Sequence, residues 1–445
     1  MSGYAEYREV NLPWLKAVPA HWEIRRNKNI FTEQKEIVGE RSADYTLLSL
    51  TLNGIIPRDM DGGGKFPESF DKYKIVKNGD MAFCLFDIDE TPRTVGLSGY
   101  NGMLTGAYTI MRVSNINARF IYYYYLALDN GKMLRPLYTG LRKTININTF
   151  QSTKVPVPPR KEQDQIVRFL DWKISSINKL INIKKKEIKA IDALKRSIVS
   201  HAITRGLTAD APMKYSGVKW LGDIPAHWKI TKLRQILHPV SEKNHPEFPL
   251  LSVVREQGVI LRDVEDKEAN HNFIPDDLSG YKVVRKGQFA MNKMKAWQGS
   301  YGVSDYTGIV SPAYFIFDIA FENLEYFHYA IRSKVYVNFF AQASDGIRVG
   351  QWDLQMDKMK EIPFIVPPAD EQIAIVKYIK QALPQYNAAI EKLTEEVAVL
   401  EEYKNKVIAD AVTGKIDVRG IEIPEYEFVD EDNDNVDENL EQGAD

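Results

Sequence analysis

The chain has 445 residues, more than one ordinary hydrophobic core needs, which indicates two or more domains. Hydrophobic residues make up 44% and charged residues 27%, as in globular proteins, and the absence of any run of eighteen apolar residues excludes a membrane-spanning helix. Cys84 is the only cysteine, which excludes intramolecular disulfides and cysteine-rich zinc sites. The first ten residues lack the apolar core of a signal peptide, so we expect a cytoplasmic protein.

The formal net charge of −2 conceals an uneven distribution. Residues 422–445 contain eleven acids and no lysine or arginine, and the other 421 residues therefore carry a net charge of +9. A basic body is compatible with nucleic-acid binding, although the signal is weak. We expect the acidic end to be disordered, and it could also compete with DNA for the basic body.

An internal repeat is the main signal in the sequence. Residues 14–22 read Trp-Leu-Lys-Ala-Val-Pro-Ala-His-Trp and residues 220–228 read Trp-Leu-Gly-Asp-Ile-Pro-Ala-His-Trp, with six of nine positions identical. Further pairs follow in the same order, among them 73–79 with 281–287, 140–142 with 346–348, and two Pro-Pro-x-x-Glu-Gln elements at 158–163 and 367–372. Chance does not keep this order over two hundred residues, so the chain is a tandem duplication.

The first part of each repeat predicts a mixed fold. Residues 74–76, 81–85 and 108–113 are rich in β-branched or aromatic side chains and are bounded by Gly, Asp and Pro, which favours short strands. Residues 120–128 and 324–332 favour short helices.

The second part of each repeat predicts one long helix. Each begins after a double proline and ends near a glycine, at Gly206 and Gly414. Apolar residues recur between these limits at steps of three and four, which is typical of a coiled-coil seam. Neither helix can bury its stripe alone, so we expect the two to pack against each other, antiparallel and related by a pseudo-two-fold axis.

The sequence therefore predicts an α+β protein with two mixed α/β domains joined by two long antiparallel helices. The expected boundaries are a first domain at 1–158, a helix at 159–206, a second domain at 207–366, a helix at 367–415 and an acidic tail at 416–445.

This order of elements resembles the specificity subunits of type I restriction–modification systems. The resemblance is carried by residues 220–228, the two Pro-Pro-x-x-Glu-Gln elements and Thr-Gly-Lys at 413–415, and it covers about 415 residues. In the first half the Trp-Leu-Gly-x-Ile-Pro element is degenerate, with Lys16-Ala17-Val18 between Leu15 and Pro19.

The resemblance implies two target recognition domains, each of which reads one half of a split site in double-stranded DNA. It implies that the helices act as a spacer and bind two methyltransferase subunits, which bind S-adenosylmethionine and methylate adenine at N6. A restriction subunit can join such a complex. For this chain it implies no cofactor, no membrane and no catalytic activity of its own.

Motifs for catalysis do not fit. Neither double proline lies in the Asn/Asp-Pro-Pro-aromatic motif of an amino-methyltransferase, and Gly62-Gly63-Gly64-Lys65 lacks the spacing of a phosphate-binding loop. Glu265-Asp266-Lys267 has the composition of a nuclease site without an evident strand partner, and a solvated loop is the better interpretation. Two alternatives to a specificity subunit stay open here: a stand-alone bipartite DNA-binding regulator and, less favoured, a metal-dependent nuclease.

Arg, Lys, Asn and Gln side chains read base edges, and cations and hydroxyls bind phosphates. Polar segments that combine these residue types are therefore candidate DNA-binding sites. In the first repeat the candidate residues form one polar segment: Arg142, Lys143, Thr144, Asn146 and Asn148. In the second repeat they form two segments: Lys293, Lys295, Trp297 and Gln298, then Arg348, Gln351 and Trp352.

Two qualifications apply to these candidates. Arg142 and Arg348 occupy equivalent repeat positions, so phosphate contacts suit them better than base contacts. For Trp297 and Trp352 two interpretations stay open: they are aromatic residues of the domain core, or they contact DNA. The repeated His21 and His227 favour a structural role, since catalysis seldom needs two copies in one chain.

Overall fold

The computed structural model describes residues 2–58, 67, 69–138, 143–263, 274–275, 277–348 and 351–430. It divides into two compact units, and each contains one part of both long helices. Among the described residues, unit 1 comprises 2–185 and 394–430, and unit 2 comprises 186–393. No helix in the described part of the chain is long and apolar enough to cross a membrane.

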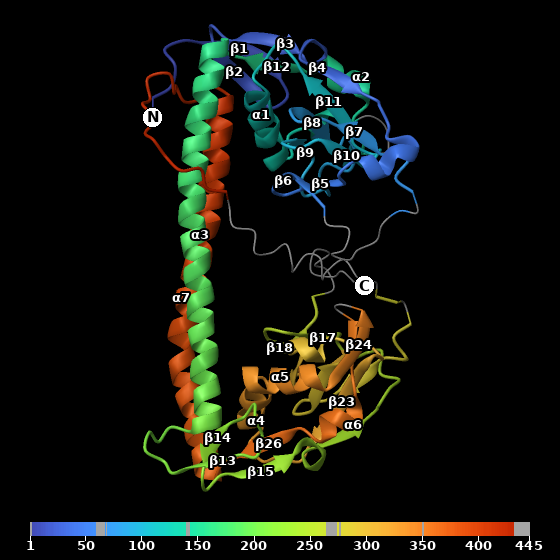
Figure 1. The fold of residues 1–445 in the computed structure, drawn as a ribbon, viewed down its shortest axis with the longest axis vertical. Coiled ribbons are helices and arrows are strands. Elements are labelled where there is room, and N and C mark those ends of the chain that lie inside the picture. Colours follow the sequence, from blue (N-terminus) through green and yellow to red (C-terminus); the bar gives the residue numbers. More distant parts are fainter. Residues whose placement is uncertain are drawn as a thin grey trace. The chain divides into compact units, whose positions relative to one another are not determined.

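Unit 1 is built on short antiparallel strands. A four-stranded sheet has the order β4-β11-β8-β9, and the other strands form two-stranded pairs β1-β2, β12-β3, β10-β7 and β5-β6 (Figure 1). The strands are β1 (Tyr7–Leu12), β2 (Leu15–Pro19), β3 (Glu23–Arg26), β4 (Phe31–Gln34), β5 (Leu48–Thr51), β6 (Gly54–Pro57), β7 (Lys74–Val76), β8 (Asp80–Phe83), β9 (Val95–Leu97), β10 (Gly102–Leu104), β11 (Thr109–Val113) and β12 (Lys154–Val157). The strands expected at 74–76, 81–85 and 108–113 are thus confirmed as β7, β8 and β11.

Unit 2 repeats this arrangement. Its four-stranded sheet has the order β16-β23-β20-β21, and its pairs are β13-β14, β15-β26, β17-β18, β19-β22 and β24-β25. The strands are β13 (Met213–Tyr215), β14 (Asp223–Pro225), β15 (Lys229–Lys232), β16 (Leu237–Val240), β17 (Leu251–Val254), β18 (Gly258–Leu261), β19 (Lys282–Val284), β20 (Phe289–Asn292), β21 (Tyr301–Val303), β22 (Gly308–Val310), β23 (Tyr314–Ile319), β24 (Ser344–Arg348), β25 (Gln351–Leu354) and β26 (Pro363–Val366).

Three of the short helices begin at asparagine caps. The Asn117 side chain accepts hydrogen bonds from the first backbone amides of α1 (Ala118–Asn130), and Asn323 does so for α4 (Leu324–Ile331). These helices confirm the expectations at 120–128 and 324–332. The remaining short helices are α2 (Ile147–Ser152), α5 (Lys334–Gln342) and α6 (Met356–Lys360).

Two long helices confirm the expected periodicity. They are α3 (Arg160–Arg205), of 46 residues, and α7 (Ala369–Val412), of 44 residues, which continues through Pro384. Within unit 1 the start of α3 and the end of α7 share one core with α1, and Lys184 pairs with Glu396. Within unit 2 Lys195 Nζ lies 3.2 Å from Asn387 Oδ1. The two helices are therefore antiparallel inside each unit.

The segment after α7 differs from the sequence-based expectation of a disordered tail from residue 416. Residues 416–430 lie against α3, where Gln165 donates hydrogen bonds to the carbonyls of Val418 (3.1 Å) and Ile421 (2.8 Å). Val418 is fully buried. Composition predicts disorder from the acids alone, but alternating apolar residues and helix side chains that bond the backbone hold this part in place. Residues 431–445 lie outside the described residues.

Candidate nucleic-acid interface

Both units contain the same joint between domain and helices. In unit 1, Glu162 in the first turn of α3 accepts hydrogen bonds from Trp22 Nε1 (2.9 Å) and Tyr4 Oη (2.6 Å), and His21 Nε2 lies 2.8 Å from its other oxygen. In unit 2, Glu371 in the first turn of α7 accepts from Trp228 Nε1 at 2.9 Å and pairs with His227. The structural role expected for the two histidines fits this geometry.

A glycine completes each joint. Gly206 at the end of α3 has φ +73° and Gly414 at the end of α7 has φ +74°, the left-handed conformation that glycine adopts without strain. A Cβ at Gly206 would lie 3.1 Å from the Trp228 ring, and a Cβ at Gly414 would lie 2.4 Å from Pro19 Cδ. The glycine thus permits each helix end to pack closely against the Trp-containing element.

In unit 1 the candidate segment lies beside the loop that follows β8. Asp87 N donates to Lys143 O at 2.8 Å and Ile145 N donates to Leu85 O at 2.7 Å, so these backbones are joined. Thr144 forms an isolated bridge with Phe86, and Arg142 lies outside the described residues. The candidates from Lys143 onward are therefore held on a fixed backbone.

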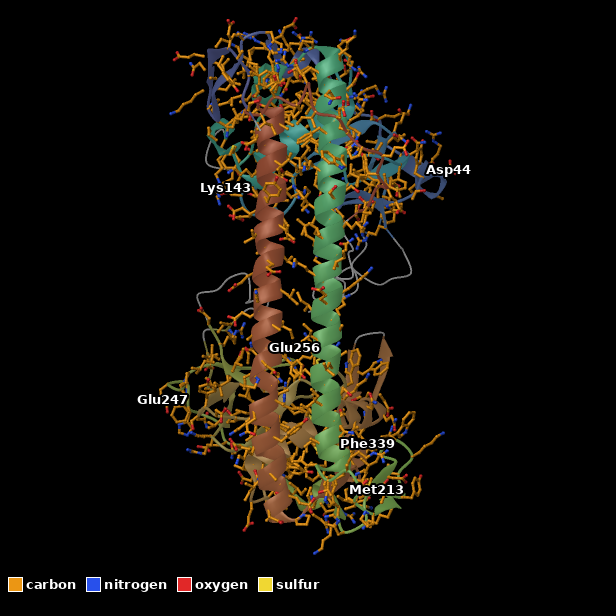
Figure 2. All side chains as sticks on the ribbon, turned by 90° about the vertical axis from the view of Figure 1, so that its left-hand side faces the viewer. Asp44, Lys143, Met213, Glu247, Glu256 and Phe339 are labelled. Carbon is orange, nitrogen blue, oxygen red and sulfur yellow. The ribbon has the colours of Figure 1, made fainter. Side chains whose placement is uncertain are left out.

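The Lys143 side chain, labelled in Figure 2, is half exposed and paired with carboxylates. Its Nζ lies 2.5 Å from Glu90 Oε1 and 3.4 Å from Asp89 Oδ2. Hydrogen bonds to these carboxylates raise the pKa of Lys143, so it remains charged at neutral pH. The hydroxyl of Tyr138, by hydrogen bonding, lowers the pKa of Asp89. A DNA phosphate at Lys143 would have to compete with Glu90.

The two asparagines of this segment have different positions. Asn146 is the N-cap of α2, and its side chain accepts a hydrogen bond from Asn148 N at 2.8 Å. Asn148 is exposed in the first turn of the same helix. Asn146 therefore has a structural contact that explains its identity, whereas Asn148 offers its amide to solvent.

In unit 2 the structure brings the two predicted segments together. Lys293 Nζ lies 2.5 Å from Asp353 Oδ2, and Leu354 N donates to Lys293 O at 3.2 Å. Lys295 is the N-cap of the short helix η5 (Ala296–Gln298), Gln298 is its last residue, and η5 contacts β25. Arg348 and Gln351 face each other in the β24–β25 pair, but their side chains lie outside what the structure describes.

Trp297 and Trp352 form the centre of this cluster. Their ring centroids are 5.0 Å apart at 39°, and both side chains are partly buried without belonging to the large core of unit 2. The Nε1 of Trp297 is buried and has no hydrogen-bond partner among the described residues. The two rings therefore pack the segment that contains Trp297 against β25.

The ion pairs of the two units are reversed in sign. The loop after β8 contributes the acids Asp89 and Glu90, and Lys143 comes from the later segment. The loop after β20 contributes the cation Lys293, and Asp353 comes from the later segment. These three acids were not predicted, because only cations, amides and hydroxyls were considered as DNA contacts and no sequence spacing predicts which loop an acid will face.

The described residues offer no metal centre. Within them, no group of three or more His, Cys, Asp or Glu side chains could hold a metal ion. The nuclease candidate Glu265-Asp266-Lys267 lies outside the described residues.

Comparisons with known proteins relate this chain to specificity subunits of type I restriction enzymes. Residues 70–190 match the family model for the type I restriction modification DNA specificity domain. The type I restriction enzyme MjaVIII specificity subunit of Methanocaldococcus jannaschii is 23% identical over 93% of this chain and 98% of its own length. The putative MjaX specificity subunit of the same organism is 22% identical over 90% of this chain and 95% of its own length.

A solved structure agrees with the fold. A chain from a study of complex assembly and conformational transition in the type I R-M system has a TM-score of 0.55 and 13% identity, covering 90% of this chain and 99% of that one. The repeated joints show that the two units are built on the same scaffold. Over nearly its whole length the chain is thus similar to specificity subunits of type I restriction–modification systems.

Proposed function

We propose that this chain is the DNA specificity subunit of a type I restriction–modification system, and that each unit reads one half of a bipartite site in double-stranded DNA. The observation that carries the proposal is the contrast within the duplication. The joints built on Glu162 and Glu371 are alike, whereas the loops after β8 and β20 have opposite charge. Two copies that must hold the same scaffold but read different bases need this combination.

The domain organisation follows from this function. The recognition domains are residues 1–158 and 207–366, and the helices at 159–206 and 367–415 are a spacer related by a pseudo-two-fold axis. Two methyltransferase subunits bind the helices, carry the S-adenosylmethionine and methylate adenine, and a restriction subunit can join them. The chain itself contributes recognition and no catalysis.

The candidate residues divide by role. Arg142 and Arg348 bind phosphates, as their equivalent repeat positions favour, together with Lys143 and Thr144. Bases are read in unit 1 from the region of Asn146 and Asn148, of which the exposed Asn148 is the better base contact. In unit 2 they are read from the cluster around the tryptophan pair: Lys293, Lys295, Trp297, Gln298, Gln351 and Trp352. Clustering of the unit 2 residues within one loop pair supports this assignment.

Co-expression with the methyltransferase subunit tests the proposal. DNA from cells carrying both genes should show adenine methylation at one split sequence, and cells carrying the methyltransferase alone should lack it. Sequence-specific DNA binding by the isolated chain, with no methylation in either strain, would favour a stand-alone regulator instead.

A further inference from the structure

Each unit contains a β-hairpin that ends in an exposed turn, β5–β6 in unit 1 and β17–β18 in unit 2. The strands of the first hairpin pair as far as Thr51 with Gly54, and those of the second as far as Val254 with Gly258. The exposed residues between these last pairs are Leu52 and Asn53 in unit 1 and Arg255, Glu256 and Gln257 in unit 2. The two turns therefore differ in length and in side-chain chemistry.

The strands of each hairpin are anchored in a small core of their own. In unit 2, Val253 and Val259 of the hairpin and Ile316 of the four-stranded sheet belong to one buried cluster. In unit 1, Ile55 of the hairpin and Ile110 of the sheet belong to an equivalent cluster. Each hairpin is therefore held by its strands, whereas its turn is exposed to solvent.

In unit 2 a single arginine joins the turn to β21. Arg332, the C-cap of α4, donates from Nη2 to the carbonyls of Arg255 and Glu256, each at 2.8 Å. Its Nη1 donates to the carbonyl of Tyr301, the first residue of β21. Because one guanidinium binds all three carbonyls, the turn is fixed relative to the strand that follows the candidate segment Lys293–Gln298.

The candidate loop of unit 2 is closed onto the same strand. Ser300, the residue before β21, donates from its amide to Lys295 O at 3.2 Å and accepts from Asn292 N at 3.0 Å. Gly302 of β21 approaches the hairpin so closely that a Cβ there would lie 3.3 Å from Gly258 Cα. The turn of β17–β18 and the candidate loop therefore lie on the same part of unit 2.

In unit 1 the hairpin lies beside the candidate loop in the same way. The strand β9 directly follows the loop after β8, which closes where Cys84 N donates to Thr94 O at 2.8 Å. A Cβ at Gly96 of β9 would lie 2.6 Å from Leu50 Cδ1 and 2.7 Å from Ile55 Cγ1 of the hairpin. Figure 1 shows β5 and β6 at the end of unit 1 away from β1 and β3, and β17 and β18 at the end of unit 2 away from β13 and β15.

The side chains of the turns are of types that read bases. The major groove of B-DNA admits a two-stranded β-ribbon, where arginine reads guanine, asparagine and glutamine read adenine, and apolar groups contact the methyl group of thymine. The turn of unit 2 offers an arginine and a glutamine, whereas the turn of unit 1 offers a leucine and an asparagine. Arg255 Nε lies 3.5 Å from Glu256 Oε1, and since both side chains are exposed, this contact costs little to break. Hairpins with the same position but different turn side chains suit two half-sites of different sequence.

We propose that the turns of β5–β6 and β17–β18 enter the major groove and read bases in the two halves of the DNA site, an inference that rests on the function proposed above. In unit 2, Arg255 and Gln257 contact base edges. Arg332 is a positioning residue, which holds the turn against β21. In unit 1 the equivalent contacts come from Leu52 and Asn53.

Methylation mapping of the complex with the methyltransferase subunit tests the two turns. The wild-type complex first defines the split site and its two halves. Arg255→Ala with Gln257→Ala should then relax discrimination about tenfold or more at one or two base pairs of one half-site. Leu52→Ala with Asn53→Ala should relax the other half-site and leave the first unchanged.

The matched control is Arg234→Ala with Gln235→Ala. Both residues are exposed and lie in η4 (Leu233–Gln235), directly after β15 and thus at the other end of unit 2. This variant loses the same two residue types as the turn variant of unit 2, and it should methylate the wild-type site.

Arg332→Leu tests the positioning role, because unit 1 has a leucine, Leu126, at the equivalent position of α1. It should relax the same base pairs as the turn variant of unit 2, since the turn loses its anchor. Relaxation at other base pairs, or at none, would overturn this role. Wild-type discrimination in either turn variant, or relaxation in the control, would overturn the reading of bases by the hairpins. A wild-type chain that directs no methylation would refute the proposed function itself.

Discussion

The joints of the two units have the same structure, whereas the recognition loops of the two units differ in charge. Glu162 and Glu371 accept a hydrogen bond from an equivalent tryptophan at the same 2.9 Å, and each joint ends on a left-handed glycine. The loop after β8 carries the acids that face Lys143, whereas the loop after β20 carries the cation Lys293, which faces Asp353. Packing of a large aromatic ring against a helix end permits few sequences, whereas a solvent-facing ion pair tolerates reversal because it stabilises the fold little.

The joints themselves are not equally buried, and this predicts the largest stability effect. Glu162 is 5% exposed and serves three partners, whereas Glu371 is 32% exposed and serves two. Glu162→Ala should lower the free energy of unfolding of unit 1 by about 3 kcal/mol, because buried donors lose their acceptor, and Glu371→Ala should cost unit 2 about 1 kcal/mol. Segment-resolved hydrogen exchange in denaturant would measure both. Glu162→Gln, which keeps an acceptor, should recover part of the loss; equal costs in the two alanine variants would contradict the comparison.

Substitution of the helix-end glycine should likewise cost more stability in unit 1 than in unit 2. Gly414→Ala should cost about 2–3 kcal/mol, because its Cβ would lie 2.4 Å from the ring carbon of Pro19 in addition to the strain of a positive φ. Gly206→Ala should cost about 1 kcal/mol, since its nearest contact, the Trp228 ring, is 3.1 Å away. Thermal or urea unfolding gives both values. A larger cost at Gly206 would show that the helix ends pack differently from this description.

Acid should destabilise unit 2 more than unit 1. Burial, followed by the charge of Arg332, lowers the pKa of His328 to about 4, while the nearby Asp305 and Glu325 act in the opposite direction. The unfolded state therefore binds the proton more readily, and stability is lost as the pH falls below about 6.5, by about 2 kcal/mol at pH 5. The equivalent position in unit 1 is Tyr122, which gains no proton.

Hydrogen exchange at pH 7 and pH 5 would measure how much stability each unit loses in acid. The pH-dependent loss should be concentrated in β21 and α4, since His328 Nδ1 accepts a hydrogen bond from Val303 N at 3.3 Å. His328→Leu should reduce it. A loss shared equally by both units would contradict the assignment to His328.

The reversed ion pairs predict the smallest effect, on DNA binding. Asp353→Asn removes the carboxylate that competes with phosphate for Lys293 and should tighten binding about two- to fivefold at low salt. Glu90→Gln should do the same through Lys143. Filter binding across a salt series would detect this, with Asp357→Asn, an exposed acid of the same unit, as the control. Weaker binding in Asp353→Asn would indicate that this acid itself contacts a base.

Much of the fold was predictable from the residues, for identifiable reasons. The double prolines and the steps of three and four predict α3 and α7 to within a few residues, because both are local signals. The path of residues 416–430 was not predictable. It depends on Ser175, Asn178 and Asn182, which in sequence are ordinary polar helix residues and only in the fold bond a distant backbone.

The candidate site was predictable in part. The repeat and the glycine-bounded segments led to the Lys293–Gln298 region and to Trp352, which the structure brings together. The capping role of Asn146 follows from the start of α2 one residue later, a short helix that the sequence analysis did not expect. The acids that face the lysines come from segments more than fifty residues away, and their positions depend on loop conformation.

Methylation mapping of a unit 2 variant tests the central claim, that each unit reads its own half of the site, most directly. Cells that express the methyltransferase with the Lys295→Ala and Gln298→Ala double variant should yield DNA in which one half-site is relaxed at one or two base pairs. The other half-site should keep its wild-type sequence, because unit 1 is unchanged. Relaxation of both half-sites, or of neither while methylation continues, would contradict the account.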